Sequence, residues 1–193
     1  MNSRTSGRGN DRGATLVEAA ISYGLLFLCL FAVVEFGMAF KDWLSVSHAT
    51  REAARAGATF GDDPSSDILV LDGVEDTLLV QGLRAGDQVR VFRANNPTPS
   101  ASQVYSYSPS FDCSNQPTLE GCCNWSPCPE FGRVLYQVPG WNPSTRDITA
   151  PGTDRIGVEI KFTHDWITGF IGTGSLDFST ITDFQLEPQL FGP

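Results

Sequence analysis

The sequence is short of positive charge, of histidine and of catalytic motifs. Its 13 lysines and arginines face 22 aspartates and glutamates, which gives a net charge of −9. An acidic exterior disfavours nucleic acid, and it disfavours adhesion to anionic lipid through charge. With only two histidines, the chain also lacks a Gly-Lys-Ser/Thr phosphate loop, a His-Glu-x-x-His motif and a Gly-x-Ser-x-Gly motif. We therefore expect neither an enzyme nor a cofactor, and no nucleic-acid partner.

Charge is also missing from a long stretch near the N-terminus. From Ala19 onward the first charged residue is Glu35, and apolar sequence resumes after it. A helix from Leu16 to Phe40, rising about 1.5 Å per residue, is about 36 Å long and can cross a hydrocarbon core of about 30 Å. A single crossing segment must be helical, because lipid offers no partner to backbone polar groups. We predict a transmembrane helix over residues 14–40, in contact with the lipid bilayer.

Two other interpretations of this stretch are weaker. A secretory signal peptide has a shorter apolar region of about 7–15 residues and a small-residue cleavage site after it. Here the apolar run is longer, and no Ala-x-Ala sequence follows Phe40 directly. A core helix of a soluble protein would alternate apolar and polar residues with helical period, and this stretch shows little of that alternation. We therefore predict that this stretch is a membrane helix.

The segment before the apolar stretch is polar and basic, so we expect a short flexible leader. Its arginines are Arg4, Arg8 and Arg12. Positive charge keeps a flanking segment in the cytoplasm, whereas Lys41 and Asp42 cancel on the far side of the helix. The predicted organisation is a leader over residues 1–13, the membrane helix, and an extracytoplasmic domain over residues 41–193.

The outer part of the chain predicts an α+β domain. Helix-favouring residues continue the membrane helix to about Gly57. The small face of Ala49, Ala53, Ala56 and Gly57 would let another helix or a sheet approach closely. A turn at residues 62–66 precedes apolar residues at helical spacing, which predicts a second helix. Alternation with a period of two predicts strands. The predicted strands are residues 88–93, 133–138, 155–163 and 175–187. A long helix leaning on a small antiparallel sheet is the expected product.

Residues 95–130 have no period and predict a long loop, which holds most of the cysteines. These are Cys113, Cys122, Cys123 and Cys128. Outside the cytoplasm such a cluster predicts disulfides that tie the loop, with three connectivities open and the bond between adjacent cysteines least favourable. The alternative is a zinc site that includes His48 or His164, but zinc sites prefer Cys-x-x-Cys pairs, so we predict no metal. Cys29, in the apolar stretch, is expected to act as a small apolar residue.

Several short blocks of sequence carry a family resemblance. They are Arg12–Glu18 (RGATLVE), Phe31–Gly37 (FAVVEFG), Ala53–Ala58 (AARAGA) and a C-terminal Leu186-Glu187-Pro188. Together they resemble the TadE-like pseudopilins of the tight-adherence (Tad) pilus, within the type IV pilin superfamily. Two positions depart from the family. Ala19 stands where major Tad pilins carry Tyr, which argues for a minor subunit, and Gly24 lies about where TadE-like helices often carry Pro.

The resemblance implies a processing site at the start of the helix. In the superfamily a prepilin peptidase cuts after a glycine and the fifth mature residue is Glu; the matching positions here are Gly13, Ala14 and Glu18. The resemblance gives Glu18 a part in processing and in registering the subunit against its neighbour, through pairing with the new ammonium of Ala14. An acid favoured by the helix dipole is a simpler account of Glu18. Glu35 is expected near the outer interface, either reaching water or paired with a partner.

The combined prediction is a minor pilin (pseudopilin), a structural subunit for assembly of a Tad-type pilus. It would sit in the cytoplasmic membrane as a single-pass protein with its C-terminal domain outside. The resemblance implies the prepilin peptidase, other Tad pilins and inner-membrane assembly proteins as partners. The alternative is a signal-anchored extracytoplasmic binding module, which would keep its leader and never enter a pilus.

Overall fold

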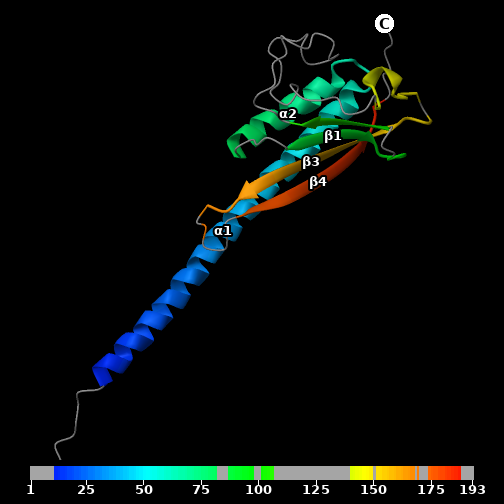
Figure 1. Ribbon diagram of the computed structural model, residues 1–193. Helices are drawn as coiled ribbons and strands as arrows, with labels where there is room; N and C mark the ends of the chain where they lie inside the picture. The colour runs from blue at the N-terminus through cyan, green and yellow to red at the C-terminus, as the bar shows by residue number, and fades with distance from the viewer. Residues whose placement is uncertain are drawn as a thin grey trace, which may run out of the picture.

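The computed structural model describes residues 11–81, 87–97, 101–106, 140–149, 151–167, 169 and 174–187. One long helix, α1 (Asp11–Phe60), forms the axis of the molecule. A second helix, α2 (Ser66–Gln81), and a four-stranded sheet pack on its C-terminal half, while its N-terminal half extends away from them (Figure 1). The predicted α+β architecture, with a long N-terminal helix leading into a small antiparallel sheet, is confirmed.

Helix α1 is continuous over 50 residues because no proline interrupts it, and it ends where glycine permits a change of direction. Gly61 has φ +50°, and its N–H donates to the Gly57 carbonyl at 3.1 Å. A glycine in the left-handed conformation just past the last turn is a common helix terminator. The helix therefore runs to Phe60, slightly beyond the predicted end near Gly57.

The turn after α1 is organised by Asp63. Its Oδ1 accepts the hydroxyl of Ser65 at 2.5 Å and the Ser65 N–H at 2.7 Å, and these two hydrogen bonds hold the pKa of the carboxyl below its ordinary value. Such an Asx turn directs the chain into α2, and the predicted second helix is confirmed. Helix α2 buries Val70, Leu71 and Val74 against the core.

The sheet is antiparallel, with the order β2-β1-β3-β4. Its strands are β1 (Gln88–Arg93), β2 (Ser102–Ser106), β3 (Arg155–Asp165) and β4 (Ser175–Gln185). The central register places Val158 opposite both Val91 of β1 and Thr182 of β4. Strands β1, β3 and β4 were predicted within two residues at each end, and the predicted strand over residues 133–138 lies outside the described residues.

Strand β2 was not predicted, because it lies in the stretch interpreted as loop. Its Gln103 is buried and its Tyr105 packs partly against the core, so the inward face of this edge strand is polar. The Tyr105 hydroxyl donates to Asp67 Oδ2 of α2 at 2.8 Å. The inward side chains are satisfied by hydrogen bonds, and a strand of this kind gives no apolar alternation for a sequence pattern to detect.

The core forms where the small residues of α1 meet α2 and β3. Ala53, Ala54 and Ala58 are buried there. A Cβ added to Gly57 would lie 2.6 Å from Ile156 Cδ1 and 2.8 Å from Val70 Cγ2, distances that only a glycine accommodates. The predicted close approach along this face is confirmed.

A buried arginine closes the core at the end of α1. The guanidinium of Arg146 is fully buried, donates to the Gly61 carbonyl at 3.2 Å and to Ser66 Oγ at 2.9 Å, and pairs with the carboxylate of Asp67. It also lies over the ring of Trp141 at 4.6 Å. A buried charge is tolerated when it is paired and hydrogen-bonded, and both terminal nitrogens of Arg146 are bonded here. Arg146 Nε and Trp141 Nε1 are also buried and have no hydrogen-bond partner among the described residues.

A second ion pair joins β1 to the start of β3. Arg93 donates from Nε and Nη2 to the two carboxylate oxygens of Asp154, both at 2.7 Å. Burial by itself raises the pKa of Asp154, but the hydrogen bonds from Arg93 and from the Asp147 N–H outweigh it and hold that pKa below its ordinary value. The same pairing raises the pKa of the Arg93 guanidinium.

Candidate functional site: the apolar helix and its junction with the sheet

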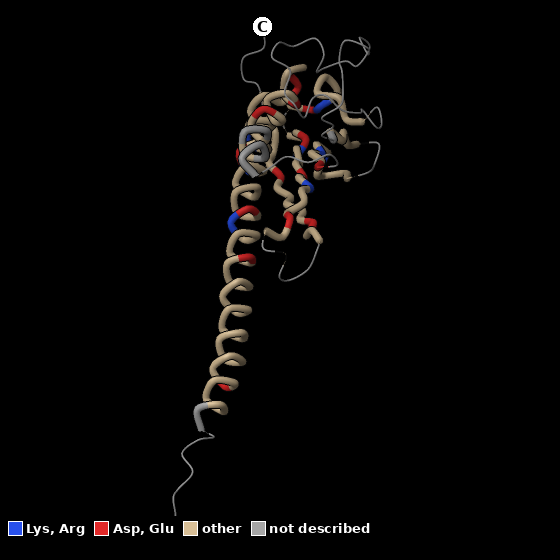
Figure 2. The backbone as a smooth tube through the Cα atoms, turned by 60° about the vertical axis from the view of Figure 1, so that its left-hand side comes forward, with Lys and Arg blue, Asp and Glu red and all other residues tan. Residues whose placement is uncertain are grey.

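The N-terminal half of α1 presents large apolar side chains to its surroundings on every side. Leu16 is 72% exposed and Val33 is 73% exposed, and similar side chains fill the turns between them. Figure 2 shows that this stretch carries no charge between an acidic residue near its start and the next acidic residue far along the helix. Soluble proteins rarely expose a contiguous apolar surface of this extent. Among the described residues, α1 is the helix long and apolar enough to cross a membrane, and its features suit a single-pass anchor.

The predicted processing residues lie on the first turns of α1. Gly13, Ala14 and Glu18 are all exposed, and nothing lies within 4 Å of a Cβ added to Gly13. Ala14 and Glu18 are four residues apart and therefore neighbours on one face of the helix. The bond between Gly13 and Ala14 lies in the first helical turn, whose N–H groups lack carbonyl partners within the helix, so this turn frays most readily.

Glu35 does not reach water as expected. The residue is fully buried, and Ala39 one turn later is 3% exposed. A single helix cannot bury its own side chains in this way. The end of the domain nearest the N-terminal half of α1 therefore covers the helix around Glu35, and we call it the lower end. The expectation of an interfacial, hydrated Glu35 was wrong because the sheet reaches further down the helix than the sequence indicated.

One contact between the sheet and α1 joins a histidine and an aspartate that are far apart in the chain. His164, near the end of β3, is buried, and its Nδ1 lies 2.7 Å from Asp42 Oδ2 on α1. The ring of Trp166 then meets the ring of His164 at 6.0 Å and that of Phe36 at 5.7 Å, both edge-on. His164 thus links β3 to α1, whereas His48 is exposed on the C-terminal half of α1.

An apolar groove lies between α1 and β4 at the same height. Its volume is about 570 Å³. It is lined by Phe36, Gly37, Ala39, Phe40 and Trp43 of α1 and by Leu176 and Phe178 of β4. Phe40 stacks on Trp43 at 5.6 Å, and Phe178 stacks on Phe162 at 5.3 Å. The groove continues the exposed apolar surface of the helix into the domain.

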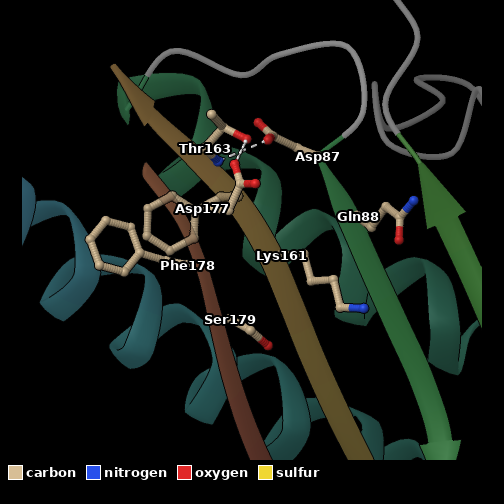
Figure 3. Close-up of a pocket in the computed structure, with 8 residues that line it drawn as sticks. Asp87, Gln88, Lys161, Thr163, Asp177, Phe178 and Ser179 are labelled. Carbon is tan, nitrogen blue, oxygen red and sulfur yellow. Dashed lines mark hydrogen bonds between the residues drawn. The ribbon is translucent and has the colours of Figure 1, made fainter. Parts of the chain in front are cut away.

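A polar concavity of about 310 Å³ lies at the end of β3, on the face of the sheet turned away from α1 (Figure 3). Thr163 stands between two carboxylates there: its N–H donates to Asp87 Oδ1 at 3.2 Å and its hydroxyl to Asp177 Oδ1 at 3.0 Å. Lys161 extends away from this group (Figure 3). Because Thr163 bonds both acids, the arrangement ties β3 to β4 and to the start of β1.

The four cysteines of the predicted disulfide loop, Cys113, Cys122, Cys123 and Cys128, lie outside the described residues. Of the residues suggested for a zinc site, His164 is bonded to Asp42. Within the part of the chain that the structure describes, no group of three His, Cys, Asp or Glu side chains could hold a metal ion. Cys29 is exposed on the apolar half of α1.

These features suit a single-pass membrane anchor, an apolar helix that continues into an α+β domain. Residues 13–55 match the family model described as TadE-like protein. The match contains Gly13, Glu18 and the block at residues 31–37, and it confirms the resemblance predicted from the sequence. The match covers the apolar part of α1 and the start of its C-terminal half, less than half of the chain. No curated protein and no solved structure matches this chain.

Proposed function

We propose that this protein is a minor pilin that is inserted in the cytoplasmic membrane, cut by a prepilin peptidase after Gly13 and used in the assembly of a Tad-type pilus. One observation carries the proposal. The first turns of a continuous helix carry the Gly13-Ala14 pair and Glu18. The helix then exposes an apolar surface long enough for a bilayer, and most of it lies in the segment that matches the TadE-like family.

The apolar half of α1 is suited both to a membrane and to the interior of a pilus fibre. In the membrane its apolar side chains are solvated by lipid tails, and in a fibre the same side chains would pack against the helices of neighbouring subunits. The C-terminal half of the same helix is built into the domain core. A pull on the helix is therefore transmitted to the folded domain through regular backbone hydrogen bonds rather than through a flexible linker.

Glu18 supplies the charge that the apolar surface otherwise lacks. Cleavage after Gly13 would leave a free ammonium on Ala14, one helical turn from the Glu18 carboxylate, at the cytoplasmic edge of the membrane. Opposite charges in a medium of low dielectric attract strongly, so the pair can form within one subunit or between two. This pairing would guide processing and would set the register of a subunit against its neighbour.

We also propose a membrane topology and a set of partners. The N-terminus lies in the cytoplasm and the α+β domain outside, where the four loop cysteines form disulfides, which non-reducing peptide mapping tests. The partners are the prepilin peptidase, other Tad pilins and the inner-membrane assembly proteins. Ala19 supports a minor rather than a major subunit, and the role is structural rather than catalytic.

Substitution of Glu18 separates this proposal from a signal-anchored binding module. A plain anchor should tolerate Glu18→Ala, since removing a carboxylate from a membrane segment lowers the insertion cost by up to roughly 2–3 kcal/mol at the centre and less near the interface. A pilin should be impaired, because one half of a desolvated pair left alone costs about 3–5 kcal/mol. We expect Glu18→Ala and Glu18→Gln to insert and fold but to be cut poorly or to fail in pilus assembly.

The matched control is Glu52→Gln, which changes an exposed acid on the same helix beyond the apolar stretch. Processing is measured from the mass of the membrane protein, and assembly by counting pili on cells with equal protein levels. Normal processing and normal piliation in both Glu18 variants would leave the pilin mechanism without its central residue.

A further inference from the structure

The lower end of the sheet lies beside the part of α1 that should meet the outer face of the membrane. Glu18 and Phe36 are about 27 Å apart along the helix, and a hydrocarbon core is about 30 Å thick. With Glu18 at the inner edge of that core, Phe36 lies close to its outer edge. Trp166, which follows β3, nevertheless contacts the Phe36 ring at 5.7 Å. The folded domain thus reaches the level of the lipid tails.

Two further observations fix the domain at this height. The hydrogen bond between His164 and Asp42, at 2.7 Å, joins the end of β3 to α1 less than two turns above Phe36. Glu35 is fully buried, although it lies one residue below Phe36 within the apolar stretch. Figure 1 shows the arrowhead of β3 pointing along α1 toward its N-terminal half. The end of the sheet is therefore held against the helix and does not stand above it.

Apolar and aromatic side chains gather at this end, beside charged ones such as Lys41 and Asp177. We call the apolar set the outer-leaflet surface: Phe36, Phe40 and Ile167 are exposed, and Trp43, Trp166 and Leu176 are half-buried. Phe40 is 59% exposed and Ile167 is 64% exposed, and the groove of about 570 Å³ opens among them. Tryptophan at the boundary of an apolar surface is typical of membrane–water interfaces, because its ring suits both surroundings.

We propose that the outer-leaflet surface rests in the outer leaflet of the same membrane that α1 spans, so that phospholipid acyl chains fill the groove and cover Trp166 and Ile167. This inference depends on the membrane anchoring in the proposed function. Lipid is the occupant because the groove is continuous with the lipid-facing part of α1 and shares Phe36 and Phe40 with it. The attraction is hydrophobic, since the net charge of −9 disfavours charge-driven binding.

A second contact with lipid has a mechanical consequence. A single helix leaves a domain free to rotate about its axis, whereas contact at the end of the sheet fixes the face that the domain turns toward the membrane. Withdrawal of the subunit from the membrane would then have to release Trp166 and Ile167 as well as α1.

Tryptophan quenching by brominated lipid tests the proposal on the full-length protein. The protein is placed, one copy per nanodisc, in zwitterionic phospholipid with or without bromine on the acyl chains. We expect Trp166→Phe to lose part of the quenching that the wild-type protein shows. Trp141→Phe is the matched control: Trp141 is buried in the core, so its removal takes away an unquenched emitter and the quenched fraction rises.

A second pair of variants tests the surface without touching a fluorophore. Ile167→Glu and Ile181→Glu change isoleucines of nearly equal exposure, 64% and 61%, but Ile181 lies on β4 away from the outer-leaflet surface. Ile167→Glu should shift the emission of the protein to the red and reduce its quenching by brominated lipid, while Ile181→Glu should leave both unchanged.

Labelling of Cys29 with a membrane-impermeant maleimide, located by peptide mapping, reports the anchor separately. If Cys29 is protected but neither Trp166→Phe nor Ile167→Glu alters quenching, the outer-leaflet contact is overturned and the anchor stands. If Cys29 is labelled, the anchor and the proposed function fail together. If the emission shifts to the blue only in discs that hold several copies, a second copy covers the surface and the assignment to lipid is overturned.

Discussion

The two halves of α1 share one unbroken backbone but are suited to different surroundings. In the N-terminal half, large side chains such as Leu25 and Phe27 are more than half exposed. In the C-terminal half the residues that face the domain are small, and Ala53 and Ala54 are fully buried. The C-terminal half also carries charges such as Lys41, Arg51 and Arg55, which the apolar stretch lacks. On the buried side the size of the residues separates the halves as well, because small residues let protein backbone approach closely.

Two glycines of α1 show the same difference at single positions. A Cβ added to Gly24 meets nothing within 4 Å, whereas one added to Gly57 would meet Ile156 and Val70 at less than 3 Å. The fold therefore does not require a glycine at position 24. It does require one at position 57, because α1, α2 and β3 cross there at close distance. A larger side chain should therefore destabilise the domain at Gly57 and leave its stability unchanged at Gly24.

The largest effect should come from removing the buried charge that closes the domain half. Arg146→Met leaves Asp67 in the core without its cation, and breaking a buried ion pair in this way costs about 3–5 kcal/mol. We expect the domain to unfold at much lower denaturant concentration while α1 still inserts. Hydrogen exchange of the sheet amides in nanodiscs measures the first effect, and resistance to alkaline extraction measures the second.

The control is Arg155→Met, which removes the partner of Asp183 where both side chains are nearly half exposed. Surface pairs contribute about 0–1 kcal/mol, so this variant should be close to wild type. Equal effects of the two substitutions would show that the buried cluster does not stabilise the domain half.

The next effect sharpens the contrast between the two glycines. Gly57→Leu forces the side chain into Ile156 and Val70, and overpacking of this kind costs roughly 1–3 kcal/mol. Gly24→Leu should leave the stability of the domain unchanged. Both variants are compared by the midpoint of domain unfolding in denaturant. Equal stability of the two proteins would contradict the packing of α1 against β3.

The smallest effect is a pH dependence confined to the domain half. The pKa of Asp154 is lowered in the folded state, so its pairing with Arg93 stabilises the domain above the unfolded pKa of about 4. That contribution is lost as the pH falls below this value and through the lower pKa of the folded protein. Thermal unfolding between pH 6 and pH 3 should show the loss, and Asp154→Asn should flatten this part of the profile.

Much of the architecture followed from local patterns in the sequence. The apolar run predicted α1, the period of two predicted β1, β3 and β4, and the small residues near Gly57 predicted a close crossing. Each of these features arises from residues close together in the chain, so a pattern in a single sequence is enough to predict it. The blocks at residues 12–18 and 31–37 also identified the family that residues 13–55 match.

What could not be predicted depends on contacts between distant residues. Asp42 and His164 are 122 positions apart, and the sequence around either residue does not indicate that the two are paired. Strand β2 was missed because its inward Tyr105 is hydrogen-bonded to α2 rather than apolar. Glu35 was misplaced for the same reason: the depth to which the sheet descends along α1 is set by tertiary contacts. The burial of Arg146 likewise arises only when α2 and the chain near Trp141 come together.

If the protein is a processed pilin, its mature chain starts at Ala14 and its apolar half lies in the membrane. The most direct test is the mass of the N-terminal peptide of the protein purified from the membranes of cells that assemble pili. We expect a peptide that starts at Ala14, with Glu18 as its fifth residue. An N-terminus at or before Gly13 in cells with functional pili would contradict it.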